Sequence, residues 1–302
     1  MKGKKLTFLE FAQSIKNIDR ACSSVFENSI SIFLPFRRID KTAMFKLFCE
    51  RNQVLEIKTE IGIFNKVEVR ARLLGQLHKD ILENLLSVPK VYNPSSMQFS
   101  MKITAYQLLK MMNKNTSNKK WLIEKIEEIA ECRIKLFYKN NDELDETYSF
   151  AFIDSIRIID NKNIEISFSQ AYTYFLAKNQ IIDYKDYIPL IMGLESNIKK
   201  IQKELGLSRA INVEFIKAIV RYMLMHKGNN SQIRLTNLAK KLNLNNIMTT
   251  REIEENMRDL KRVEIQKIIK DNFGLSLVSD NQTLKYNKQN DKNKFILGTN
   301  LI

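Results

Sequence analysis

The order of predicted elements along this chain occurs twice, and that repetition constrains the fold more than any other feature. In the second copy, residues 232–235 form a short extended run, and 236–242 carry Leu and Ala at helical spacing. A polar turn over 243–248 follows, after which Thr249 and Glu252 form a capping box that begins another helix. Two helices joined by a turn, the second rich in Arg, Asn and Thr, are the parts of a helix-turn-helix.

The first copy repeats this order in the first half of the chain. An extended run over 97–103 ends at Thr104, a predicted N-cap, and helices are expected over 105–112 and 119–130 with a polar turn between them. Thr236 is the corresponding predicted N-cap in the second copy. The same layout is therefore expected twice in one polypeptide.

Each copy is also flanked by the same kinds of element. A predicted helix precedes each copy and a pair of strands that suits a hairpin follows it: the helices at 73–86 and 213–226, the strands at 150–159 with 163–168 and at 275–279 with 283–286. The segment 263–273 either prolongs the preceding helix or forms a separate strand and short helix. The pattern predicts an α+β protein with two tandem winged-helix domains and an N-terminal helical extension.

We expect three parts along the chain. The N-terminal helical extension covers 1–50, the first winged-helix domain 51–180, and the second, DNA-binding winged-helix domain 181–302. An amphipathic pattern after Thr7 predicts the helix of the extension. The apolar run over 30–36 is either an oligomerisation arm or a segment packed on the body, and packing is favoured.

Positive charge is concentrated toward the end of the chain. The formal net charge is +15, and from residue 199 to 302 there are 20 Lys and Arg against 10 Asp and Glu, which gives +10 of that total. Clustered positive charge fits a polyanion such as nucleic acid, or an acidic membrane surface. A low-GC genome is the alternative explanation, because it enriches Lys, Asn and Ile without any partner.

The features that would indicate catalysis are missing from the sequence. No P-loop sequence occurs, so ATP-driven unwinding by this chain is not expected. His78 and His226 fall in separate predicted domains, whereas a nicking enzyme needs paired histidines and a tyrosine nucleophile. The acidic run over 142–146 falls between strands and suits a solvated hairpin loop better than a metal site. We therefore expect no enzyme, no catalytic residues, no cofactor and no metal.

The cysteines and the apolar runs suggest a compartment. Cys22, Cys49 and Cys132 are an odd, scattered set without a CxxC pair, so neither a zinc ribbon nor a disulfide framework is indicated. Glu10 interrupts the basic start, which suits a signal peptide poorly, and no apolar run approaches membrane-spanning length. A cytoplasmic protein without membrane contact is expected.

Several stretches resemble the TrfA-type plasmid replication initiators, within the wider class of tandem winged-helix Rep proteins. The likeness spans roughly residues 51 to 290, and the stretches that carry it are 77–82, 99–112, 121–133, 152–154, 163–168 and 221–226. The first 50 residues have no counterpart, an additional helix predicted over 188–205 is unusual, and the turn over 243–248 is long. The resemblance implies binding to repeated double-stranded DNA sites at an origin, opening of the duplex, and recruitment of a host replicative helicase or its loader. Association with a bacterial nucleoid or plasmid is implied only by this resemblance. A homodimer is an open alternative to a monomer.

In a winged helix, the second helix of the helix-turn-helix enters the major groove and the hairpin touches the backbone. The DNA-binding residues expected on this basis are Lys114, Asn115, Lys119 and Lys120 in the first domain and Lys240, Lys241, Thr249, Thr250, Arg251, Asn256, Arg258, Arg262, Lys285 and Lys288 in the second. Thr249, Thr250 and Arg251 would hold a phosphate, Asn256 would pair with adenine, and Arg258 or Arg262 would pair with guanine. For each residue alone, ordinary surface exposure is the alternative.

Three other interpretations stay open. Trp121 either stacks on an unpaired base or, as its neighbours Leu122 and Ile126 favour, is a partly buried core residue. A transcriptional repressor of the same fold would bind an inverted repeat as a two-fold dimer. A DNA-cleaving enzyme ranks last, because no catalytic constellation is present.

Overall fold

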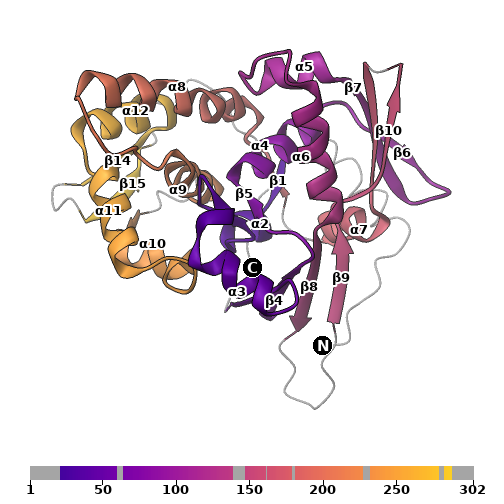
Figure 1. Ribbon diagram of the computed structural model, residues 1–302, viewed down its shortest axis with the longest axis horizontal. Helices are drawn as coiled ribbons and strands as arrows, with labels where there is room; N and C mark the ends of the chain where they lie inside the picture. The colour runs from indigo at the N-terminus through magenta and orange to yellow at the C-terminus, as the bar shows by residue number, and fades with distance from the viewer. Residues whose placement is uncertain are drawn as a thin grey trace.

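The computed structural model describes residues 21–59, 64–138, 147–160, 162–178, 181–226, 232–278 and 282–287. Helices and small antiparallel sheets are mixed along the chain, which confirms the α+β class (Figure 1). The helix expected after Thr7, the acidic run over 142–146 and Lys288 lie outside the described residues. Among the described residues, every helix is too short or too polar to span a bilayer.

The first repeated unit has the predicted element order. Its elements are α4 (Gln76–Ser87), β6 (Val91–Asn93), β7 (Gln98–Thr104), α5 (Ala105–Met111), α6 (Lys119–Glu131), β10 (Ile153–Ile159) and β11 (Asn163–Phe168). The strands form one antiparallel sheet in the order β10-β11-β7-β6, so the hairpin β10–β11 pairs with the strand that precedes α5. Thr104 caps α5 as predicted, and it also forms a capping box with Gln107.

The second repeated unit follows the same order with one helix more. It comprises α9 (Val213–Met225), β13 (Gln232–Arg234), α10 (Leu235–Lys241), α11 (Thr250–Leu260), α12 (Val263–Phe273), β14 (Leu275–Leu277) and β15 (Thr283–Tyr286). The sheet order β13-β15-β14 matches β7-β11-β10 of the first unit strand for strand. The segment left open in the sequence is a separate helix, α12, which begins after Arg262 and ends at Gly274 in a left-handed conformation.

Three details differ from the sequence prediction. Thr236 lies inside α10, whose N-cap is Arg234. The strand expected over 150–159 is split at Phe152 into β9 (Thr147–Ala151) and β10. A second four-stranded sheet, β3-β4-β8-β9, is formed by β3 (Val54–Lys58), β4 (Phe64–Arg70), β8 (Arg133–Tyr138) and β9. The hairpin β8–β9 therefore leaves the first unit between α6 and β10, which sequence order alone did not reveal.

The described part of the N-terminal segment packs into the molecule. It contains β1 (Ser23–Ser24), α2 (Val25–Ser29), β2 (Phe33–Leu34) and α3 (Ala43–Glu50). The apolar run over 30–36 is buried, with Ile32 and Leu34 fully inaccessible, and β2 pairs in parallel with β5 (Leu74–Gly75). Packing rather than an exposed arm is confirmed for this run. The domain boundaries proposed after residues 50 and 180 remain predictions.

Helix α4 of the first unit and α9 of the second meet in the middle of the molecule (Figure 1). Their facing sides carry Asp80 and Glu83 on α4 and Lys217 and Arg221 on α9, all almost fully buried. Arg221 Nη2 donates to both carboxylates at 2.6 Å, and Lys217 Nζ lies 2.5 Å from Asp80. A buried charge is tolerated only when it is paired and hydrogen-bonded, so these contacts fix how the two helices meet.

The network extends into the N-terminal segment through Glu27 on α2. The Glu27 carboxylate accepts from Lys79 of α4 and, at 2.6 Å, from the Tyr172 hydroxyl of α7 (Gln170–Lys178). The buried charges balance: Glu27, Asp80 and Glu83 against Lys79, Lys217 and Arg221. Burial opposes the charge of Arg221, but Glu83 and Asp80 outweigh it and raise the pKa of Arg221 well above its usual value.

We expect Arg221→Met to reduce the free energy of unfolding by about 3–5 kcal/mol, because it leaves buried Asp80 and Glu83 without their main partner. Urea unfolding at neutral pH measures this loss. Lys200→Ala is the control, since Lys200 is exposed on α8 (Ile188–Glu204) and should change stability by less than about 0.5 kcal/mol. A loss of under about 1 kcal/mol for Arg221→Met would mean that the network does not hold the units together.

Candidate nucleic-acid interface

The start of α11 is built by the capping box that the sequence predicts. Thr249 Oγ1 accepts from the Glu252 backbone N–H at 3.2 Å, and the Thr249 N–H donates to the Glu252 carboxylate at 2.8 Å. Glu252 therefore already occupies the donors of Thr249 that were expected to hold a phosphate. Thr250 and Arg251 are exposed at this end, and the Arg251 side chain is 89% accessible.

Helix α11 has one buried and one exposed face. Arg251 and Arg258 lie on the exposed face. Asn256 is only 6% exposed and lies on the inner face with Met257 and Leu260, so the predicted pairing of Asn256 with adenine is corrected. Asn256 lies three residues after Ile253 and four residues before Leu260, so helical periodicity places it on their apolar side, which is why it points inward.

A groove of about 480 Å³ runs between α10, α11 and the start of β15. Leu235, Ala239, Ile253 and Met257 are its apolar lining, and its polar lining residues are Thr236, Asn245, Glu254, Arg258, Lys261 and Gln282. Of the described residues at the β14–β15 hairpin, Gln282, just before β15, lines this groove. Arg258 and Lys261 have no carboxylate partner among the described residues, so their charges are available to an anion.

The other predicted cations of the second unit that the structure describes do not line this groove. Lys240 and Lys241 are exposed at the end of α10, and Lys285 is half-buried on the central strand β15. Arg262 is half-buried and donates to Asp259 at 3.1 Å, so its guanidinium group is partly used within the protein.

Two further cations, Lys267 and Lys270, are exposed on α12 but are not among the predicted DNA-binding residues. Their spacing within 263–273 fits the solvent side of a helix, a signal that the ambiguous periodicity of this segment concealed.

The first unit presents a different surface. Lys119 and Lys120 are exposed at the start of α6, but Glu124, Glu127 and Glu131 follow along its exposed side. Their spacing of three and four residues places them in one stripe. A stripe of carboxylates repels phosphate, so α6 is poorly suited to enter a DNA groove.

Two further predicted residues of the first unit are engaged within the protein. Asn115 Oδ1 accepts from the backbone N–H and the hydroxyl of Ser117, which closes the turn before α6. Lys114 Nζ lies 2.6 Å from the Glu195 carboxylate of α8 and faces the cleft between the two units. The structure therefore does not bring Lys114 to an outer DNA-binding surface with Lys119 and Lys120.

Trp121, His78 and His226 each contact other groups of the protein. Trp121 is half-buried against the core, in agreement with the favoured expectation. His78 accepts from the Gly75 N–H through Nδ1 and lies 2.6 Å from Glu128 through Nε2. His226 is the C-cap of α9, and burial together with the charge of Lys241 lowers its pKa. Within the described residues, no group of three His, Cys, Asp or Glu side chains is arranged to hold a metal ion.

No protein-family model matches this chain, and no curated protein matches it in sequence. It is similar to the crystal structure of domains 2-3 of RctB, with a TM-score of 0.42 and 12% identity over 77% of this chain and 88% of that chain. A selenomethionine derivative of domain 2 and domain 3 of RctB gives a TM-score of 0.42 and 11% identity, and the match covers 70% of this chain and 78% of that chain. These scores are too low to establish a shared fold, so they carry no weight in assigning a function.

We expect Glu195 to stabilise the contact between the units only above acidic pH. Burial alone would raise its pKa, but hydrogen bonds from Lys114 and Lys199 outweigh burial and lower it from 4.5 to about 2. The contribution is therefore complete above pH 4.5 and is lost as the pH falls toward 2. Solvent screening limits it to about 1 kcal/mol.

Urea unfolding of the wild type and Glu195→Gln between pH 7 and pH 3 measures this contribution. The difference in free energy of unfolding should be constant near neutral pH and should shrink as the acid range is entered. A difference that persists unchanged at pH 3, or that grows there, would contradict the assignment.

Proposed function

We propose that this chain is a non-enzymatic replication initiator whose two repeated units are winged helices and whose second unit binds double-stranded DNA. The observation that carries the proposal is the groove along α10 and α11, which is lined by Arg258, by Lys261 and, from the turn before β15, by Gln282. In a winged helix, DNA lies against the helix and the hairpin that border such a groove. The topology that creates this groove is the same in both units.

The second unit supplies the main DNA contacts in this proposal. Arg258 reaches base edges as a bidentate donor, whereas Lys261, Lys267 and Lys270 contact phosphates. The first unit contributes less, because the exposed side of α6 carries Glu124, Glu127 and Glu131 beyond its basic start. Lys119 and Lys120 touch at most the DNA backbone beside the principal site.

The initiator role follows from how the units are joined and from the resemblance to TrfA-type initiators. The buried network around Arg221 holds both units in one orientation, so the protein approaches DNA as a single body. Sites arranged as direct repeats suit such a body, because each molecule then binds in the same direction. Duplex opening draws on binding energy and DNA strain, and a host helicase or its loader is then recruited.

Reversing the charge of Arg258 and Lys261 together should weaken binding to a duplex carrying the origin repeats by at least about a hundredfold. Each lost phosphate or base contact contributes about 1–3 kcal/mol, and reversal adds repulsion. The matched control reverses Lys119 and Lys120 on α6, where we expect less than about a tenfold loss. Fluorescence anisotropy with labelled duplex measures both, and equal losses would contradict the leading role of the second unit.

Binding should also weaken steeply with salt. A protein that neutralises several phosphates loses on the order of a thousandfold in affinity over a few-fold rise in salt. The same anisotropy titration at several salt concentrations gives the slope. Affinity independent of salt would contradict DNA binding through these cations.

Footprinting beside the gene separates two functions. Protected direct repeats near an AT-rich stretch support the initiator, and a single protected inverted repeat supports a repressor.

A further inference from the structure

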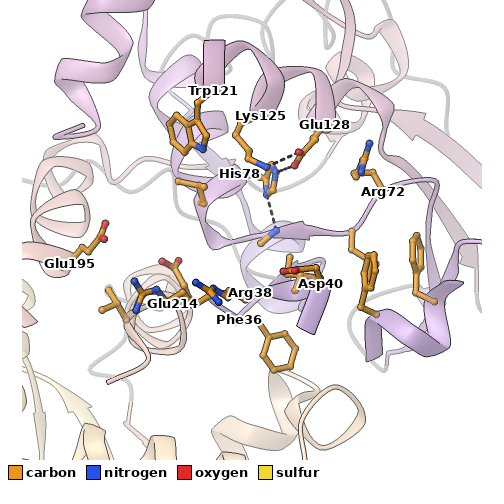
Figure 2. A pocket seen from close by; sticks show the side chains of 18 of the residues that line it. Phe36, Arg38, Asp40, Arg72, His78, Trp121, Lys125, Glu128, Glu195 and Glu214 are labelled. Atoms are coloured by element: carbon orange, nitrogen blue, oxygen red, sulfur yellow. Dashed lines mark hydrogen bonds and ion pairs between the residues drawn. The ribbon is translucent and has the colours of Figure 1, made fainter. Parts of the chain in front are cut away.

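A cleft of about 560 Å³ lies between the two units and has no role in the DNA contacts described above. One wall is α6 and the start of α4, another is α8 with the start of α9, and the segment 36–49 closes a third side (Figure 2). Its volume falls within the range typical of small-molecule sites. Such a cavity buries a ligand between parts of the chain that are far apart in sequence.

The apolar part of the cleft includes a tryptophan that is unique in the sequence. Trp121 extends from α6 into the cavity, and Leu77, Phe45 and Phe48 also line it (Figure 2). The Trp121 side chain is half-buried, so part of it stays accessible from the cavity. Aromatic and apolar walls of this kind favour a planar, unsaturated ring.

The basic part of the cleft contains two guanidinium groups that the protein does not use. Lys114 and Lys199 are bonded to Glu195, and Lys125 is bonded to Glu128. Arg37 and Arg38 are exposed, line the same cavity and have no carboxylate partner among the described residues. Guanidinium groups bind phosphate oxygens in a two-pronged manner, so this pair suits a phosphate rather than a single neutral acceptor.

The carboxyl group of Glu214 faces Trp121 across the cavity; one of its oxygens lies 3.9 Å from Lys217 Nζ and the other lacks a hydrogen-bond partner among the described residues. Glu214 extends from the start of α9 toward the cavity (Figure 2), and its side chain is 16% exposed. Burial is the largest influence on the pKa of Glu214 and raises it. A carboxyl oxygen accepts hydrogen bonds, which matches an amino group at the edge of a nucleobase.

We propose that this cleft binds a nucleoside phosphate, with the base between Trp121 and Glu214 and the phosphate on Arg37 and Arg38. The three features lie in one cavity and each matches a different part of that ligand: ring, hydrogen-bonding edge and anion. The same chemistry belongs to a free nucleotide and to an unpaired nucleotide of a DNA strand. Because both units line the cleft, a bound ligand stabilises their present orientation.

Trp121 fluorescence in the full chain without duplex DNA tests the site, since no other tryptophan contributes to the signal. The probes are ATP, GTP, CTP and UTP, their monophosphates, and a short oligothymidylate. We expect saturable quenching by at least one probe, and a rise in Tm with its concentration. Calorimetry with the same probes gives the affinity independently of the fluorophore.

Arg37→Ala with Arg38→Ala should weaken that affinity by about tenfold or more, because charge-assisted bonds to phosphate are lost. The matched control, Lys200→Ala with Lys203→Ala, removes the same charge from exposed positions of α8 that do not line the cleft and should leave the affinity unchanged. Glu214→Gln should alter the preference among bases more than the affinity for phosphate.

Quenching by mononucleotides assigns a free nucleotide as the ligand, and quenching by the oligonucleotide alone assigns an unpaired strand. No binding of any probe by calorimetry at millimolar concentration would overturn the proposal, as would equal losses in the two double variants. These results are separate from the proposed function, because duplex binding through α11 is measured without nucleotide and with Arg37 and Arg38 intact.

Discussion

The buried pairing of Arg221 with Asp80 and Glu83 is the interaction on which the arrangement of this protein depends. Replacing a buried ion pair by well-packed apolar residues is often neutral or stabilising, so net stability alone does not explain it. The planar guanidinium group of Arg221 and its several hydrogen bonds allow α4 and α9 few relative orientations. Lys217 bonds to the same Asp80, and Lys79 links α4 to Glu27 of α2. We infer that the network specifies how α4 and α9 meet, and with them the two units.

This fixed arrangement presents two units of the same topology with different surfaces. Strand order is shared between β10-β11-β7 and β14-β15-β13. The exposed side of α6 carries Glu124, Glu127 and Glu131, whereas that of α11 carries Arg251 and Arg258 together with Glu252 and Glu254. The first unit also carries the second sheet and contacts the N-terminal segment. The two units thus share a strand order but differ in where their exposed cations lie. The cleft between the copies is a product of joining them.

Strongly periodic segments could be predicted from the sequence with accurate bounds. The strand Asn163–Phe168 and the start of the helix Val213–Met225 were located to the residue, and the capping box at Thr249 identified the start of α11. Periodicity failed where tertiary contacts decide the outcome. The inward position of Asn256 follows from the packing of α11, and the stripe of glutamates on α6 is visible at helical spacing in the sequence.

The buried network could not be predicted in the same way. Polar residues of α4 such as Asp80 and Glu83 have the spacing of an ordinary solvated face, and their partners lie 137 to 141 residues away in the sequence. Lys217 and Arg221, two cations one turn apart in a mostly apolar helix, are the only local sign of it. Long-range pairing of this kind is set by the fold as a whole.

Site-specific photocrosslinking tests the central claim, that the second unit rather than the first binds DNA, most directly. A photoreactive amino acid replaces Arg258 on α11 in one variant and Glu127 on α6 in another, since both positions are exposed at matching sites of the two units. The account predicts crosslinks to duplex DNA from position 258 and none above background from position 127. Crosslinks from position 127 with none from position 258 would contradict it.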